Sequence, residues 1–131
     1  MFKTLVGMET KSHSFEDLLI WQEGMEICYQ IYDNLVNCRD FGLKDQMQRA
    51  AVSIPSNIAE GFELNTNRAF IRHLYISKGS AGELRTQLYI AIRQGYISQE
   101  IGSQLIERTK RIGGMIYNFI AARKIRNRRT Q

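Results

Sequence analysis

Apolar residues recur at alternating steps of three and four in four successive segments of this chain, and this pattern constrains the fold more than any other sequence feature. Such spacing is typical of helices that each bury one narrow stripe, whereas half-buried strands alternate at every second residue. The chain contains a single proline, Pro55, so little else breaks a helical pattern. We therefore expect an all-α protein, built as an up-down-up-down antiparallel four-helix bundle with neighbouring helices inclined by about 20°.

Each expected helix has its own apolar series. In the first helix, residues 15–36, the series is Leu18, Trp21, Met25, Cys28, Tyr32 and Leu35. In the second, which should end at Gly61, it is Leu43, Met47, Ala50, Ile54 and Ile58. In the third, which Gly95 should close, it is Phe70, Leu74, Ser77, Ala81, Leu84, Leu88 and Ala91. In the fourth, it is Ile101, Leu105, Arg108, Ile112, Met115, Phe119 and Ala122.

Short polar residues mark the expected helix starts. Ser14 with Asp17 forms a possible capping box, and residues 65–67 and Ser98 supply the later N-caps, because their side-chain oxygens accept hydrogen bonds from free backbone N–H groups. Pro55 lies inside the second helix. Its ring removes one backbone hydrogen bond, so we expect a kink or a short interruption there.

Charge is unevenly distributed along the chain. Five of the 18 Lys and Arg residues lie in the last nine positions, which contain no acid, so the remaining basic residues balance the 13 acidic ones. We expect three parts: a flexible N-terminal arm (1–14), the bundle (15–122) and a basic C-terminal tail (123–131). A block of cations usually contacts nucleic acid or another polyanion, and the alternative is an end that only keeps the protein in solution.

The chain offers no recognisable catalytic or metal-binding constellation. Motifs of phosphate-binding loops, serine hydrolases, zinc proteases and dinucleotide sites are absent. His13 and His73 are isolated, and Cys28 and Cys38 have no partner at metal-ligand spacing. We therefore expect no enzymatic activity, no metal and no cofactor. No apolar run reaches the roughly 18 residues of a membrane span, and no secretory signal begins the chain, so we expect a cytoplasmic protein without a membrane role.

A polar stripe is the most unusual feature of the second helix. Its members share one helical face: Gln46, Arg49, Ser53, Asn57 and Glu60. Arg49 and Glu60 are about 16 Å apart along the helix axis and cannot pair with each other, so we expect both to be partly buried and bonded to other helices. Two interpretations stay open: a polar network that fixes the helix register, or a recognition surface for a partner.

The fourth helix carries a second apolar line beside its first. The line consists of Ile106, Gly113, Ile116 and Ile120. A helix that is apolar on two faces packs against two partners. The line is therefore either part of a wide core face or an interface with other copies of the chain. We predict the second, an oligomer interface.

The same helix carries a basic face. Lys110, Tyr117 and Lys124 recur every seven residues, with Arg111 beside them. Cations contact phosphates and aromatic rings stack on bases, so this face suits nucleic acid, although an ordinary solvated face is the alternative. The predicted nucleic-acid-binding residues are Lys110, Arg111, Tyr117, Arg123, Lys124, Arg126, Arg128 and Arg129.

Several segments resemble a bacterial family of four-helix-bundle proteins. They are Phe15–Leu18, Ile20–Gln22, Ile31–Tyr32, Phe41–Leu43 and Gln46–Gly61, followed by Phe70, Leu74, Lys78–Ser80, Glu83–Leu84, Gln87–Leu88 and Gly95–Ile97. The family includes proteins encoded in intervening sequences of large-subunit ribosomal RNA genes. The resemblance implies a homopentameric barrel of four-helix protomers without known catalytic activity. Similar proteins accompany reverse transcriptases in diversity-generating retroelements, where they bind the polymerase and nucleic acid.

These observations predict a non-enzymatic, oligomeric, nucleic-acid-associated adaptor. The resemblance implies a more specific role as an accessory subunit of a reverse transcriptase in a diversity-generating retroelement. The expected partners are other copies of the chain, in a pentamer, together with RNA or DNA and a reverse transcriptase. The alternative is a protein-interaction scaffold with no direct nucleic-acid role.

Overall fold

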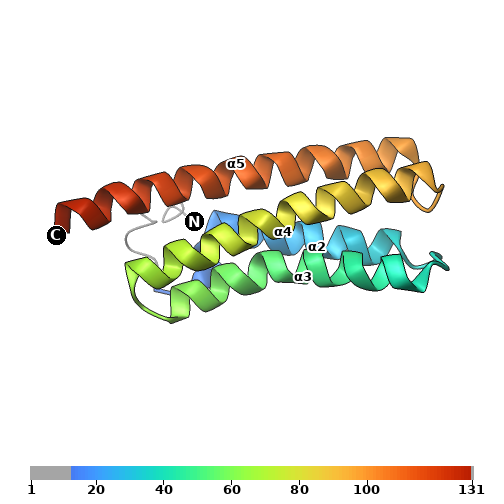
Figure 1. Cartoon of the computed structure of the whole chain (residues 1–131). Coiled ribbons are helices and arrows are strands. Elements are labelled where there is room, and N and C mark those ends of the chain that lie inside the picture. Colours follow the sequence, from blue (N-terminus) through green and yellow to red (C-terminus); the bar gives the residue numbers. More distant parts are fainter. Residues whose placement is uncertain (1–12, 131) are drawn as a thin grey trace.

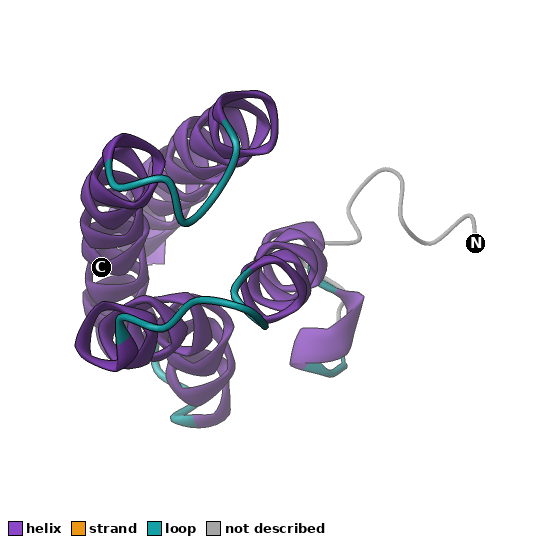
Figure 2. Cartoon of the chain, turned by 90° about the vertical axis from the view of Figure 1, so that its right-hand side faces the viewer, coloured by secondary structure: helices purple, strands orange, loops and turns teal. Residues whose placement is uncertain are grey.

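The computed structural model describes residues 13–130, with side chains described for 13–126. In that range it contains η2 (Phe15–Asp17), α2 (Leu19–Asn34), α3 (Phe41–Glu63), α4 (Asn67–Arg93) and α5 (Gln99–Thr130). The four α-helices lie side by side and alternate in direction (Figure 1), and viewed end-on they surround a common core (Figure 2). The predicted all-α four-helix bundle is confirmed. Apart from His13 and Ser14, the predicted arm 1–14 lies outside the described residues.

The α4 helix follows its predicted pattern closely. All seven residues of its apolar series are buried. At its start, the Thr66 hydroxyl accepts a hydrogen bond from Ala69 N at 3.1 Å. At its end, Gly95 has a φ of +81° and Tyr96 N donates to the carbonyl of Ala91 at 2.9 Å. This is the Schellman arrangement, in which a glycine in the left-handed conformation closes a helix.

The first predicted helix begins later than expected. Residues 15–17 form a separate 3₁₀ turn, and α2 starts at Leu19. The Ser14 side chain makes no capping hydrogen bond, so the predicted capping box is wrong. Instead, Gln22 Nε2 donates to the carbonyl of Glu16 at 2.8 Å and ties the turn to the helix.

The buried stripe of this helix matches the predicted series at Leu18, Cys28 and Leu35 and differs from it elsewhere. Gly24, Ile27 and Ile31 face the core, whereas Tyr32 is 44% exposed. A Cβ atom at Gly24 would lie 3.2 Å from Ile54 Cγ2 on α3, so the two helices approach each other closely here. The stripe passes through a residue without an apolar side chain, and the spacing of apolar side chains alone therefore misplaced it.

Pro55 lies within a continuous helix. The α3 helix runs from Phe41 to Glu63 without the interruption that the sequence predicted. Pro55 is buried where α3 meets α2, with its Cβ and Cδ atoms each 3.5 Å from a Cβ built on Gly24. On the other side, the Ser77 hydroxyl of α4 donates to the carbonyl of Ile54 at 2.8 Å. Both neighbouring helices thus pack at or beside the proline.

Gly61 does not end α3, although the sequence predicted that it would. The helix continues to Glu63, and the positive φ of 60° falls on Asn65. Gly61 is buried, and a Cβ atom there would lie 2.7 Å from His73 Cβ on α4. The absence of a side chain therefore serves close packing of α3 on α4, and not helix termination.

The predicted oligomer interface on α5 is largely part of the protomer core. Ile106 is 6% exposed, Ile116 0% and Ile120 2%. The prediction is wrong for these three residues, and the wide core face is the correct interpretation. The buried stripe advances by four at Ile112, Ile116 and Ile120, so it drifts away from a strict heptad and reaches the second line.

Within residues 13–130, no helix combines the length and apolar character needed to span a membrane.

Candidate nucleic-acid interface

The basic end of the chain continues α5. The helix runs through Arg123 to Thr130, so no break in secondary structure separates the predicted bundle from the predicted tail. Figure 1 shows this end of α5 extending beyond the start of α4. Basic residues near a helix C-terminus also interact favourably with its partial negative charge. All five terminal cations are therefore carried on helical backbone.

Arg123 is engaged inside the protomer. Its Nε donates to Asn67 Oδ1 at 2.8 Å, while Asn67 Nδ2 donates to the Arg123 carbonyl at 2.9 Å. The guanidinium carbon lies 4.9 Å from the centre of the Phe70 ring and 5.9 Å from that of Phe119. Burial, and secondarily the charge of Arg126, lowers the pKa of Arg123. This residue fixes α5 to the start of α4, which makes it a weaker candidate for phosphate contact than the sequence predicted.

The cations beyond Arg123 differ in their surroundings. Lys124 Nζ donates to the Tyr75 hydroxyl at 2.6 Å and lies 5.1 Å from the centre of that ring. Arg126 is exposed. The side chains of Arg128 and Arg129 lie outside those that the structure describes. The predicted tail thus supplies one exposed arginine and one lysine paired with an aromatic ring within the described side chains.

Arg111 belongs to an ion cluster between α5 and α2. Glu23 of α2 is bonded by Arg111 Nη2 at 3.2 Å and by Arg108 Nε at 3.0 Å. A second bond joins Arg108 Nη2 to the other Glu23 oxygen, and this pairing raises the pKa of Arg108. Arg111 therefore contributes to helix packing, which makes it a weaker candidate for nucleic-acid contact than the sequence predicted.

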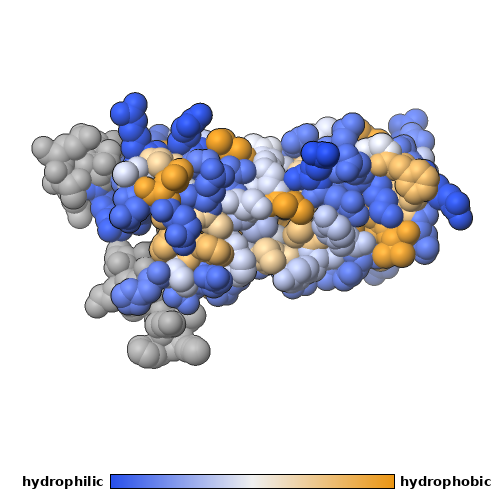
Figure 3. Space-filling view, turned by 90° about the horizontal axis from the view of Figure 1, so that it is seen from below, coloured by the Kyte–Doolittle hydropathy of each residue, from blue (hydrophilic) through white to orange (hydrophobic). Residues whose placement is uncertain are grey.

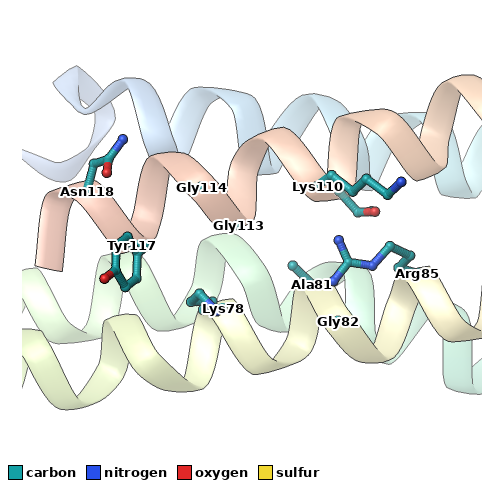
Figure 4. Close-up of a pocket in the computed structure, with 10 residues that line it drawn as sticks. Lys78, Ala81, Gly82, Arg85, Lys110, Gly113, Gly114, Tyr117 and Asn118 are labelled. Atoms are coloured by element: carbon teal, nitrogen blue, oxygen red, sulfur yellow. The ribbon is translucent and has the colours of Figure 1, made fainter.

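An open groove of about 360 Å³ lies between α4 and α5 (Figure 4). Lys110 and Tyr117, both predicted to bind nucleic acid, lie along its α5 side. Lys78 and Arg85 lie along its α4 side, and sequence reasoning did not select them. Lys78 and Arg85 are seven residues apart, as are Lys110 and Tyr117. The sequence alone does not show that this face of α4 lies beside the basic face of α5. Gly113, the fourth predicted interface residue, also lines this groove.

The polar stripe of α3 is divided between two environments. Ser53 Oγ lies 2.7 Å from Ser80 Oγ, and Asn57 Oδ1 lies 3.0 Å from His73 Nδ1, so these two residues join α3 to α4. This is the inter-helix network that one interpretation proposed.

The charged members of the stripe differ: Arg49 contradicts the prediction, whereas Glu60 makes a long inter-helix ion pair despite its exposure. The Arg49 side chain is 79% exposed and its Nε bonds Asp45 of the same helix at 2.9 Å, so the expectation of burial and an inter-helix bond is wrong. Glu60 is 64% exposed, with its Oε1 4.0 Å from His73 Nδ1. Gln46 is exposed as well. A polar residue on a helix face is thus buried only where a neighbouring helix covers it.

Other reactive groups do not assemble into a site in the part of the chain described. Cys28 and Cys38 are free and buried, and burial raises the pKa of the Cys28 thiol. Among residues 13–126 no three His, Cys, Asp or Glu side chains gather as metal ligands would.

The fold and charge distribution define a four-helix-bundle protein with a basic final helix. The chain belongs to the family described as 23S rRNA-intervening sequence protein, whose sequence profile matches residues 16–118. The predicted family resemblance is thus confirmed. A crystal structure of a protein with unknown function from the S23 ribosomal protein family of Bacteroides thetaiotaomicron VPI-5482 is similar in fold, with a TM-score of 0.73 and 26% sequence identity. The similarity covers 78% of this chain and 98% of that one. No curated protein sequence matches this chain.

Proposed function

We propose that this protein is a non-enzymatic adaptor that binds nucleic acid through the basic end of α5. The observation that carries this proposal is the concentration of the whole excess positive charge on the C-terminal turns of one helix that extends past the bundle. Phosphate contacts by arginine and lysine supply most sequence-independent binding. The family description, which refers to a 23S rRNA intervening sequence, supports an RNA partner.

The fixed position of Arg123 gives this end a defined direction. Because Asn67 bonds both the side chain and the carbonyl of Arg123, α5 leaves the bundle at a set point. The remaining cations follow as a helical projection and not as a loose peptide, so less conformational entropy is lost when they contact phosphates.

Self-assembly forms the second part of the proposal. Tyr29 and Tyr32 are 54% and 44% exposed and lie three residues apart on α2, and Val36, 68% exposed, follows in the turn just beyond the end of the helix. This apolar face replaces the α5 line as the support for an oligomer. The face in Figure 3 shows apolar patches separated by polar residues. A pentamer, and a role beside a reverse transcriptase, rest on the family resemblance and are proposed on that ground.

The proposal is tested by fluorescence anisotropy with a labelled uridine oligonucleotide across about 50 to 200 mM salt. The R126Q/R128Q/R129Q variant should bind more weakly, with a log-log salt slope smaller by about 2 if all three arginines reach single-strand phosphates. The R39Q/R72Q/R93Q variant removes three exposed arginines from other parts of the surface and serves as the matched control. No binding by the full chain at low salt, or equal losses in both variants, would favour the protein-interaction scaffold.

A further inference from the structure

Positive charge lines both sides of the groove between α4 and α5. Lys78 and Arg85 come from α4 and Lys110 comes from α5, and none of the ten residues that line the groove is acidic. No hydrogen bond or ion pair engages Lys78 or Arg85 within the described side chains. Lys110 has one exposed partner, Glu107, whose Oε2 lies 3.4 Å from Nζ. The groove therefore has cations available for an anionic ligand.

Glycines separate these cations. Figure 4 shows Arg85 opposite Lys110 toward one end, Tyr117 and Lys78 toward the other, and Gly82, Gly113 and Gly114 between them. A Cβ atom built on Gly113 or Gly114 would meet nothing within 4 Å, and one on Gly82 would meet only the Arg85 side chain at 3.9 Å.

Packing within the protomer does not require these glycines. At Gly61, in contrast, an added Cβ would come within 2.7 Å of His73. Glycine within a helix is less stable than alanine. Three glycines around an open groove therefore weaken two helices without improving their mutual packing, and what they provide is room for a ligand to approach the backbone.

Aromatic rings continue along the same track. Tyr117 is 60% exposed beside the groove, and Lys124, seven residues further along α5, pairs with Tyr75 of α4. From Lys110 to Lys124 the two helices present cations and tyrosines in alternation over about 20 Å. Alternating cations and aromatic rings suit a single strand, whose phosphates are accessible and whose bases are free to stack.

Twofold self-association explains this surface less well. In a ring such as the proposed pentamer the groove would meet a different patch of the neighbouring copy, and the charge and stacking variants below distinguish that case. A twofold contact between two copies of the groove would bring Lys78, Arg85 and Lys110 close to their own equivalents, because the same patch meets itself in such an interface. Like charges would then face one another across the contact. A polyanionic strand instead neutralises these charges.

We propose that the α4–α5 groove binds single-stranded nucleic acid, with Lys78, Arg85 and Lys110 on its phosphates and Tyr117 stacked on a base. This inference rests on the proposed function and deepens it, since it adds a second contact surface and specifies the form of the ligand. Gly82, Gly113 and Gly114 admit the strand to the surface of the helices.

The decisive experiment compares two alanine variants by thermal unfolding and by anisotropy with the labelled uridine oligonucleotide. G82A/G113A/G114A should unfold at a higher temperature and yet bind more weakly. Gly79→Ala is the matched control, because Gly79 lies on α4 outside the groove and an added Cβ there also meets nothing within 4 Å. It should raise the melting temperature and leave binding unchanged. Wild-type affinity in the triple variant would overturn the inference.

Charge and stacking variants test the named contacts. K78Q/R85Q/K110Q should lower the single-strand salt slope by about 2, whereas R39Q/R72Q/R93Q should not. Tyr117→Ala should weaken binding by roughly 5- to 150-fold and Tyr117→Phe should restore it. An equal loss for duplex and single-stranded probes would overturn the single-strand assignment, and dissociation of an oligomer without loss of binding would identify the groove as a protomer contact.

The two proposals fail separately. If R126Q/R128Q/R129Q weakens binding while the groove variants retain wild-type affinity, the projecting end binds nucleic acid and the groove does not. If the full chain fails to bind the oligonucleotide at low salt, both proposals are overturned.

Discussion

Arg123→Ala should destabilise the fold strongly, although Arg123 stands in a run of basic residues whose composition alone indicates only nucleic-acid binding. The mutation removes the hydrogen bond from Nε to Asn67, and a hydrogen bond involving a charged group contributes about 1.5 to 3 kcal/mol. It also removes the contacts with the Phe70 and Phe119 rings, each cation–π contact contributing roughly 0.5 to 1 kcal/mol. We expect a loss of about 2.5 to 5 kcal/mol, and of order 10 °C in melting temperature.

The assay is urea unfolding followed by circular dichroism at one protein concentration, since assembly would make stability depend on concentration. Arg126→Ala is the control, because Arg126 is exposed and its loss should change stability by no more than about 0.5 kcal/mol. Arg123→Lys should recover only part of the loss, since lysine keeps the charge but not the planar donor group. A double-mutant cycle with Asn67→Ala should give a coupling energy of roughly 1 kcal/mol or more. Equal stability of Arg123→Ala and Arg126→Ala, or a coupling near zero, would refute the reasoning.

Three further predictions concern the body of the bundle. Gly102→Ala should cost about 1 to 3 kcal/mol in unfolding experiments, because its new Cβ would clash with Ile92; a neutral result would show that Ile92 moves freely. Glu23→Gln should lower stability by roughly 1 to 3 kcal/mol at low salt, since the Glu23 carboxylate bonds both Arg108 and Arg111, and an unchanged urea midpoint would contradict that role. The Cys28 thiol, with its pKa raised by burial above 9.0, should react with iodoacetamide much more slowly in the folded than in the unfolded chain. Because the unfolded chain loses this proton first, the contribution of Cys28 to stability is present below pH 9.0 and is lost at higher pH, so Cys28→Ala should flatten the decline above that pH.

The sequence predicted α4 well, since all seven residues of its series are buried and only Ser80 and Gln87, two further buried residues, were missed because they are polar. In α2 the stripe passes through Gly24, which has no side chain, and Tyr32 was selected in error. In α5 the stripe turns gradually around the helix, so a strict heptad separated Ile116 and Ile120 from the core to which they belong. Apolar spacing thus fails where backbone contact or helical drift determines burial.

The candidate interface was less predictable, because its parts come from different helices. Lys110 and Tyr117 stand out on one face of α5, but Lys78 and Arg85 gain significance only when α4 is placed beside them. The structural role of Arg123 was missed for a related reason: a charge count does not show that Asn67 and two phenylalanine rings contact it. The distribution of charge is a property of the sequence, whereas its availability depends on packing.

Because α5 is one continuous helix, the groove and the projecting end have a fixed rotational phase. Inserting one residue between Gly114 and Arg123 would rotate everything beyond it by about 100° and advance it by about 1.5 Å. Arg123 would then leave Asn67, and Lys124 would leave Tyr75. Inserting seven residues would restore the phase to within about 20° while moving the end outward by roughly 10 Å. A nucleic-acid strand that contacts both the groove and the basic end of α5 would respond differently to the two insertions. The first changes the direction in which the basic end points, and the second changes its distance from the groove.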